Sequence, residues 1–324
     1  MVRLVLTLAL LVTLALSIAV GAGDLGAEEL RETYLTLRTG RTLAAFIAGA
    51  SLSVAGVVVQ GLFRNPLASP SILGTTAGAV LGGNGALMLF ELVLGAAAIA
   101  SVPAEMIVPF GCVVGAFLSL LVLVFVVRRV NDLLVLLLTG FILSALFVSL
   151  GSFLTSLAQE SWQLGRAVIA FSLGSVSGTG LRQIAFVTPL FLVGVAASYA
   201  WGRTLDLLAS GEEEAASLGV DVRSARLWAA VWVAVLTGSA VALGGALNFV
   251  GLVIPHLLRP FVGSVHRRLV PLTAIAGGTF VVLADVVVRT IPSRTEVPLG
   301  VITALVGAPV FLVILHRVLR GHHG

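Results

Sequence analysis

Residues 133–157 read LLVLLLTGFILSALFVSLGSFLTSL, a run without a single charged side chain. Crossing the hydrocarbon core of a bilayer takes about 20 predominantly apolar residues as a helix, because lipid offers the backbone no hydrogen-bond partners. Residues 133–138 are continuously apolar, whereas the strands of a membrane barrel would alternate apolar and polar residues. The run therefore predicts a transmembrane helix and argues against a membrane β-barrel.

The rest of the chain has the same character. Of its 324 residues, 58% are hydrophobic and 10% are charged, against about 25% charged in an ordinary soluble domain. We predict an all-α integral membrane protein with about ten transmembrane helices, forming one transmembrane domain over residues 1–324. The predicted spans are residues 3–22, 41–62, 71–93, 104–127, 133–157, 181–201, 224–244, 246–262, 269–290 and 298–319, with a further short helix at 161–174.

The reactive side chains exclude several kinds of chemistry. All 19 basic residues are arginine, so the chain has neither a Walker A lysine nor a lysine Schiff base. The single cysteine, Cys112, excludes a disulfide framework or a cysteine-rich metal site. The five histidines lack metal-ligand spacing, and no Gly-x-Ser-x-Gly elbow is present. We therefore expect no catalytic residue, no metal site and no cofactor.

The arginines predict the orientation, because positively charged loops stay in the cytoplasm. If the N-terminus is cytoplasmic, ten spans place the C-terminus in the cytoplasm as well. In this orientation twelve arginines lie on the cytoplasmic side and seven lie on the external side. The external set is Arg31, Arg38, Arg41, Arg166, Arg182, Arg289 and Arg294. The apolar run after Arg3 could also be a cleaved signal peptide; we expect a retained helix because the run is long for a signal, and both cases give the same loop assignments.

Two patterns within the spans predict how helices meet. Gly74, Gly78 and Gly82 recur every four residues, as do the small residues at 45, 49 and 53, and such grooves let helix backbones approach closely in lipid.

Asp285 is the clearest ionisable residue at membrane depth, and Arg289 follows it by four residues. This spacing predicts an ion pair on one helix face. A proton relay is the alternative, although a proton-driven transporter would more usually show several carboxylates or histidines along its spans.

Residues 206–221, DLLASGEEEAASLGVD, form the most distinctive polar stretch. The acidic residues after Gly211 suit the positive end of a short helix, and Gly219 could end it. Leucines flank the acidic residues. The stretch is either a solvated acidic loop or a helix that docks on a partner, and the residues alone leave both open.

Three separated blocks resemble the FecCD family of ABC importer permeases. The first comprises RTGR at 38–41, QGLFRNPLA at 60–68 and LGTTAG at 73–78, and the second is GEEEAASLGV at 211–220. The third comprises FVGLVIPHLLR at 249–259, LAD at 283–285 and EVPLGVITALVGAP at 296–309. The motifs occur in order and in register, and the resemblance covers essentially residues 3–319.

The resemblance implies a type II ABC importer permease fold, as in vitamin B12 permeases, embedded in the cytoplasmic membrane. It further implies a homodimer with the solute pathway along its two-fold axis. Two ABC ATPase subunits and an extracytoplasmic solute-binding protein complete such an importer, and no nucleic acid takes part. ATP hydrolysis lies in a separate chain, so the permease is not an enzyme. The cargo expected first is a ferric siderophore and second vitamin B12; relatives also carry haem, molybdate or tungstate.

The resemblance also assigns roles to individual residues. Binding-protein docking falls to Arg38, Arg41 and Arg289, although Gly40 stands where the family usually has proline between the two arginines of this loop. ATPase coupling falls to the cytoplasmic loop at about 204–222, with Leu207, Leu208, Glu212, Glu213, Glu214, Leu218 and Gly219. The cytoplasmic gate and pathway comprise Asn65, Leu67 and Ser144.

Two other classes of function are less well supported by the sequence. An ion-coupled secondary transporter is disfavoured by the few carboxylates within the spans and by the non-inverted order of the motifs. An intramembrane enzyme is disfavoured because no paired nucleophile and base, and no set of metal ligands, stands out.

Overall fold

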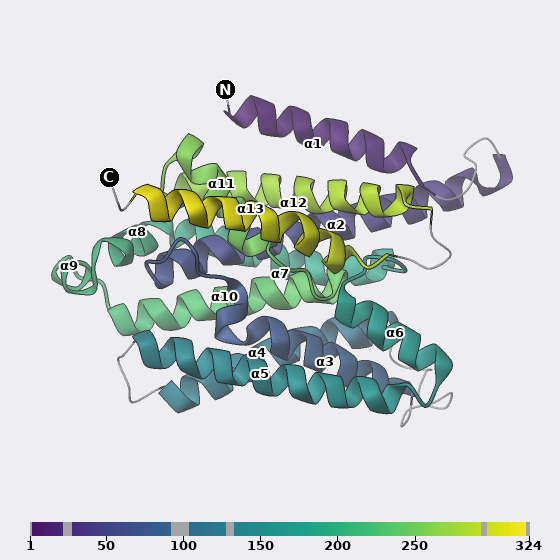
Figure 1. The fold of residues 1–324 in the computed structure, drawn as a ribbon, viewed down its shortest axis with the longest axis horizontal. Helices are drawn as coiled ribbons and strands as arrows, with labels where there is room; N and C mark the ends of the chain where they lie inside the picture. The colour runs from purple at the N-terminus through teal and green to yellow at the C-terminus, as the bar shows by residue number, and fades with distance from the viewer. Residues whose placement is uncertain (1, 22–27, 92–103, 128–132, 293–296, 322–324) are drawn as a thin grey trace.

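The computed structural model describes residues 2–21, 28–91, 104–127, 133–292 and 297–321, and throughout these residues the regular structure is helical (Figure 1). Eight of the helices there are long and apolar enough to cross a membrane. They are α1 (Val2–Ala19), α2 (Glu28–Leu62), α4 (Ala104–Val127), α5 (Leu133–Ala158), α7 (Leu181–Ala200), α10 (Val222–Gly244), α12 (His266–Thr290) and α13 (Leu299–Gly321). The shorter ones are η1 (Pro70–Leu73), α3 (Thr75–Leu89), α6 (Trp162–Leu173), α8 (Gly202–Ser210), α9 (Glu212–Ser217) and α11 (Val250–Val262).

The predicted all-α membrane architecture is confirmed, and α6 lies within the short helix predicted at 161–174. Two of the ten predicted spans are shorter than expected. The span at 71–93 is divided, because Gly74 adopts a left-handed φ of 76° and separates η1 from α3. The span at 246–262 begins only at Val250, because Gly245 and Phe249 also have positive φ. Residues 92–93 and Arg294 lie outside the described residues.

The second predicted span begins earlier than expected. We predicted residues 41–62, whereas α2 is helical from Glu28. Hydropathy marks only the part of a helix that suits lipid, and no proline or glycine interrupts residues 28–39. The polar segment before residue 41 is therefore a helical extension.

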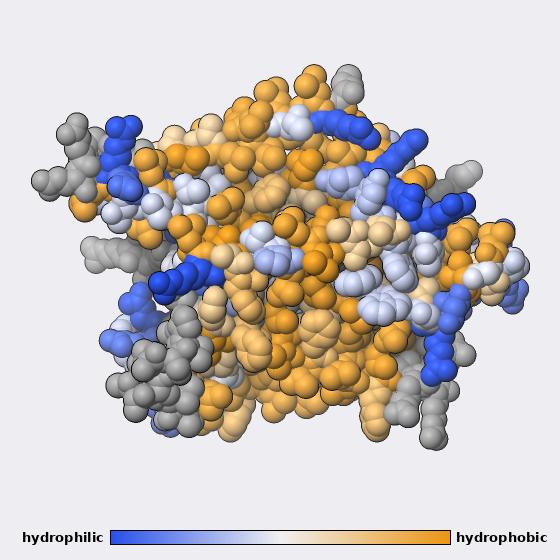
Figure 2. Space-filling model, turned by 180° about the vertical axis from the view of Figure 1, so that it is seen from behind, coloured by the Kyte–Doolittle hydropathy of each residue, from blue (hydrophilic) through white to orange (hydrophobic). Residues whose placement is uncertain are grey.

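The long helices run along the long axis of the molecule, and α8 and α9 project at one end (Figure 1). We call this the α9 end. The opposite end carries Asp285, 19 residues after His266 in α12, which corresponds to about 28 Å of helix. Figure 2 shows apolar residues covering the middle of one face and hydrophilic residues gathered toward its two ends. This distribution is that of a bilayer-spanning protein.

Two helices form the centre of the bundle. The span windows of α2 and α10 are 89% and 78% buried, whereas those of α1 and α5 are 11% and 17% buried. The central helices pack against α12, α4, α7 and α11, and the peripheral helices leave broad apolar faces uncovered. In a membrane, lipid tails cover these faces, and no hydrophobic driving force favours burying them against other helices.

The predicted small-residue grooves are contact surfaces. A Cβ atom added at Gly78 would lie 2.7 Å from the carbonyl oxygen of Gly115, and one at Gly82 would overlap that of Gly111. The first groove thus joins α3 to α4, whereas Gly74 belongs to the turn before α3. In the second groove, Gly49 meets Gly277 in the same way and joins α2 to α12.

Candidate functional site

Asp285 is the centre of an ionic cluster at the end opposite α9. Its side chain is fully buried and forms two ion pairs, from Oδ1 to Nη2 of Arg41 and from Oδ2 to Nη2 of Arg289, each 2.8 Å long. The predicted pair between positions 285 and 289 is therefore confirmed. Arg41 comes from α2, 244 residues before Asp285, and no pattern in the sequence predicts this second pair. We call Arg38, Arg41, Asp285 and Arg289 the arginine cluster.

Arg38 and Arg289 also bind the carboxyl end of α1. Arg38 donates hydrogen bonds of 2.8–3.0 Å to the carbonyl oxygens of Ile18, Ala19 and Gly21. Carbonyl groups at the end of a helix lack partners within the helix and carry its partial negative charge, so guanidinium groups suit them.

Arg289 makes the equivalent contacts from α12. Its Nη1 donates to the carbonyl oxygens of Ser17 and Val20, both at 2.9 Å, and its Nη2 donates to Ser17 Oγ at 2.5 Å. Ser17 Oγ further lies 2.6 Å from the hydroxyl oxygen of Thr42 in α2. The cluster thus fastens α1 to α2 and α12.

These contacts bear on the docking role predicted for the three arginines. The side chains of Arg38 and Arg289 are buried, and that of Arg41 retains 21% of its surface exposed. All three are engaged within the chain. Sequence reasoning missed the role of α1, because a backbone carbonyl is an acceptor that no residue type signals.

At the α9 end, α8 is joined to the start of α12. Asp206 Oδ1 lies 2.6 Å from His266 Nδ1 and accepts a 3.0 Å hydrogen bond from the backbone N–H of the same residue. Burial raises the pKa of Asp206, but the hydrogen bonds from His266 and the nearby charge of Arg267 outweigh it and lower the pKa below 3.8. His266 is itself buried. The pair holds α8 in a fixed position on the bundle.

Glu212 fastens α9 to its neighbours. Its Oε1 forms ion pairs with Arg226 of α10 and, at 3.6 Å, with Arg64 in the loop after α2. The acidic stretch forms the two short helices α8 and α9 rather than an irregular loop. Gly219 ends this segment with φ of 85°, as its position after the helix predicts.

The predicted coupling residues divide into two groups in the structure. Glu213, Glu214, Leu218 and Gly219 are exposed. Glu212 is held in its ion pairs, Leu208 is buried beside Ala215, and Leu207 packs against the same small cluster. The first group faces outward, and the second fixes the two helices.

The predicted gate residues lie in and near the turn between α2 and η1. Asn65 Oδ1 accepts a 2.9 Å hydrogen bond from the backbone N–H of Leu67, which is the local turn that Asn-Pro favours. Ser144 of α5 donates a 2.9 Å hydrogen bond to the carbonyl oxygen of Ser71 in η1. The structure therefore connects α5 to the segment that follows the turn.

One side of α5 is unusual for a helix facing lipid. Its carboxyl-terminal half exposes Ser149, Ser152 and Ser156. Spacings of three and four residues place these polar side chains on one helix face. We call them the α5 polar stripe.

Comparison with known proteins agrees with this arrangement. The profile of the FecCD transport family matches residues 5–317. The Fe(3+) dicitrate transport system permease protein FecD of Escherichia coli (strain K12) is 37% identical over 280 residues, covering 86% of this chain and 84% of that protein. The cobalamin import system permease protein BtuC of Halobacterium salinarum is 37% identical over 310 residues, with 93% and 78% covered.

The likeness extends to a more distant cargo and to a solved structure. The molybdate import system permease protein MolB of Haemophilus influenzae is 32% identical over 336 residues, covering 98% of this chain and 95% of that protein. A solved inward-facing structure of a metal-chelate type ABC transporter superposes with a TM-score of 0.84 and 31% identity, covering 97% of this chain and 98% of that chain.

Proposed function

Because this chain belongs to the FecCD transport family of ABC importer permeases, we propose that it moves a metal chelate or a related cofactor into the cell as a homodimer. The permease is not itself an enzyme, since hydrolysis of ATP belongs to a separate subunit. A ferric siderophore is the first candidate cargo and vitamin B12 the second, in keeping with the iron citrate and cobalamin named for its relatives. The protein spans the membrane several times, and we place both termini in the cytoplasm.

The α5 polar stripe carries the proposal. Polar side chains exposed at membrane depth are unfavourable against lipid and usually face a bundle interior or a water-filled cavity. Among the described residues, these serines are exposed and most of the surface of α5 is uncovered. A second copy placed against α5 would enclose the stripe along a two-fold axis. The solute would then pass between two stripes, by alternating access.

At the α9 end we place the ATPase subunits. Glu213, Glu214 and Leu218 offer an exposed acidic and apolar surface on short helices. The pairs of Asp206 with His266 and of Glu212 with Arg226 fix those helices to the bundle. A movement of the ATPase subunits would therefore be transmitted through α8 and α9 to the membrane helices α10 and α12.

At the opposite end we place the solute-binding protein. Arg41 retains exposed surface and can offer a guanidinium to a carboxylate of that partner. Arg38 and Arg289 contribute positive charge behind it while they hold α1. We therefore propose direct contact for Arg41 and a supporting role in docking for the other two.

Co-purification with the cognate ATPase tests the assignment of the α9 end. We expect a double variant, Glu213→Arg with Glu214→Arg, to release the ATPase, and the control Glu160→Arg, an exposed acid at the other end, to retain it. Glu212 is left unchanged because its ion pairs hold α9. Equal retention by both variants would contradict the assignment. Uptake by vesicles that contain the permease without any ATPase would support the ion-coupled alternative.

A further inference from the structure

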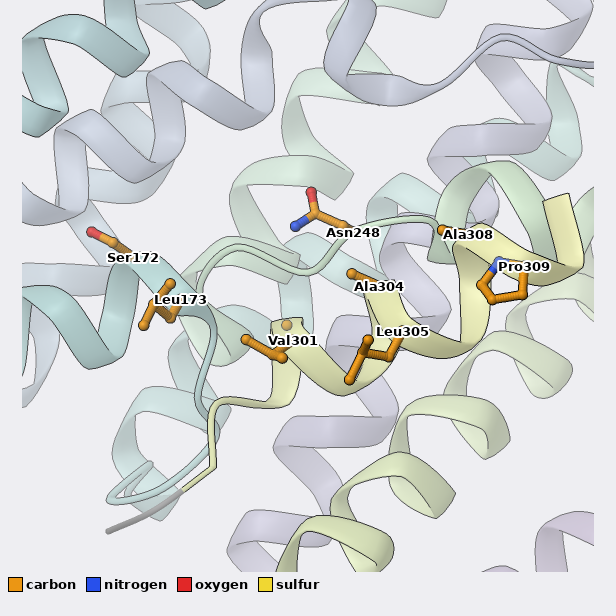
Figure 3. Close-up of a pocket in the computed structure, with 9 residues that line it drawn as sticks. Ser172, Leu173, Asn248, Val301, Ala304, Leu305, Ala308 and Pro309 are labelled. Carbon is orange, nitrogen blue, oxygen red and sulfur yellow. The ribbon is translucent and has the colours of Figure 1, made fainter. Parts of the chain in front are cut away.

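A hollow of about 450 Å³ lies between α6, the 245–249 loop and α13 (Figure 3). Ser172 and Asn248 are the residues with polar side chains in its lining. Figure 3 shows them on separate segments, with Asn248 drawn between Ser172 and the α13 residues Ala304, Leu305 and Ala308. The hollow thus combines two neutral hydrogen-bonding groups with a carbon wall.

Two further hollows adjoin the first one. One of about 230 Å³ shares Asn248 with it and is lined by Ser69 and Ser71. Another, of about 440 Å³, shares Leu173 and is lined by Arg166 of α6 and by Val297 and Pro298, which precede α13. Ser71 is the residue whose carbonyl oxygen accepts from Ser144. The lining residues of the three hollows thus extend from Arg166 of α6 to Ser71, in the segment that follows the predicted gate.

Asn248 lies at membrane depth. It precedes α11, whose 13 residues rise about 20 Å. The other end of α11 lies next to His266, at the α9 end. A bilayer core is about 30 Å thick, so Asn248 is inside it. The amide is nevertheless exposed, which is unfavourable unless water or a solute meets it.

The backbone beside Asn248 is held in a strained conformation. Phe249 has φ of 65°, which a residue with a side chain rarely adopts. Its Cβ packs where Gly307 of α13 lacks one, and its ring lies 6.5 Å from that of Phe311. Such strain persists where surrounding contacts fix it and is frequent at functional sites. Here it holds Asn248 at the boundary of two hollows.

Ser172 is positioned by a buried polar residue. Asn84 of α3 is 1% exposed, and its Nδ2 donates a 2.9 Å hydrogen bond to Ser172 Oγ. A buried amide inside a membrane bundle is costly, and this one is directed at a side chain of the hollow. The hydrogen bond from Asn84 thus fixes the position of the Ser172 hydroxyl in the lining of the hollow.

We propose that the three hollows form part of the wall of the solute track in each subunit, beside the α5 polar stripe, and that Asn248 and Ser172 contact the passing solute. This inference rests on the proposed permease function. Among the described residues, the two hollows that contain Asn248 are lined by no ionisable side chain, and the third is lined by one, Arg166. The part of the track beside Asn248 therefore suits an organic solute with a carbon surface and neutral polar groups, such as the outside of a metal chelate, better than a bare oxyanion.

Cysteine labelling of the full-length permease in lipid nanodiscs tests the track. Asn248→Cys is treated with a membrane-impermeant, charged methanethiosulfonate, which needs a thiolate and hence water. The native Cys112 is fully buried, so the wild type gives the background. The control Leu192→Cys lies on an exposed, lipid-facing part of α7. We expect Asn248→Cys to react at least about tenfold faster than this control, because a thiol in lipid stays protonated.

A second variant guards against misfolding of the strained loop. Ala304→Cys changes a small residue of α13 that lines the same hollow, and it too should react faster than Leu192→Cys. Rates equal to that of the lipid-facing control at both positions would overturn the track. The oligomeric state is measured on the same samples. A dimer with unreactive cysteines overturns the track alone, whereas a monomer contradicts the proposed homodimer and leaves the reactivity to decide whether the hollow holds water.

Discussion

Arg41 of α2 and Asp285 of α12 form a two-point ion pair, in which Nη2 lies 2.8 Å and Nε 2.9 Å from the same carboxylate oxygen. The second oxygen of Asp285 faces Arg289. One buried carboxylate therefore pairs with two guanidinium groups and joins two helices that are far apart in the sequence. Several measurable consequences depend on this and on the other contacts described above.

Asp285→Asn should destabilise the protein strongly. The variant keeps the shape of the side chain but leaves the largely buried Arg41 and Arg289 without a counter-charge. Breaking a buried pair in this way costs roughly 3–5 kcal/mol, and the partial exposure of Arg41 places the expected loss near the lower value. Thermal unfolding in detergent measures it. Glu160→Gln, at an exposed acid, is the control, and an Asp285→Asn variant as stable as this control would contradict the prediction.

Arg38→Gln should loosen α1 without disturbing the central helices. It removes a guanidinium that donates to three carbonyl groups at the carboxyl end of α1. Losing about 1.4 kcal/mol of local stability corresponds to tenfold faster exchange. We therefore expect amide hydrogen exchange in residues 16–20 to rise by about this factor, while α10 keeps its protection. The matched control is Arg182→Gln, an exposed arginine of α7, and equal exchange in the two variants would refute the capping role.

The pair of Asp206 and His266 should make stability depend on acid pH. Burial opposes ionisation of Asp206, but the His266 hydrogen bonds prevail and its pKa in the folded state is lowered from 3.8. A lowered folded-state pKa stabilises the protein above the unfolded-state value and loses this effect as pH falls through the folded-state value. When the pH is lowered from 7 to below 3.8, the melting temperature should therefore decrease less in Asp206→Asn than in the wild type. The exposed Glu213→Gln provides the comparison, and identical pH profiles for Asp206→Asn and the wild type would disprove the link.

A single methyl group should distinguish two glycines of α3. Gly78→Ala brings a Cβ within 2.7 Å of the Gly115 carbonyl oxygen and should cost about 1–3 kcal/mol. Gly85→Ala meets only one atom, 4.0 Å away, and should be neutral or stabilising by up to about 1 kcal/mol. Thermal unfolding of the pair gives the comparison. Gly78→Leu should go further and separate α3 from α4, so wild-type stability and transport in that variant would exclude the close contact.

Features that depend on local sequence were predictable. Hydropathy located the spans, and the four-residue spacing of Asp285 and Arg289 predicted their pair. The starts of α2 and α11 could not be predicted in this way. The helix α2 extends beyond the apolar segment that hydropathy detects, and α11 begins late because Phe249 adopts a left-handed backbone conformation that its residue type does not indicate.

Contacts between distant segments were equally hidden from sequence reasoning. Asp206 and His266 are 60 residues apart, and Arg41 and Asp285 are 244 apart. Nothing in the residue types selects one arginine among 19 as a partner. The resemblance supplied positions for the coupling and docking residues, but only the fold separates those that face outward from those that hold the helices in place.

The helix α12 is pinned at both extremities, by Asp206 at His266 and by Arg41 at Asp285. A helix keeps its length because each turn is closed by backbone hydrogen bonds. The part of α12 between His266 and Asp285 therefore keeps a fixed length of about 28 Å. The two ends of the bundle can tilt or slide relative to each other, but they cannot separate along the axis of α12 unless this helix unwinds or one of the two ion pairs breaks.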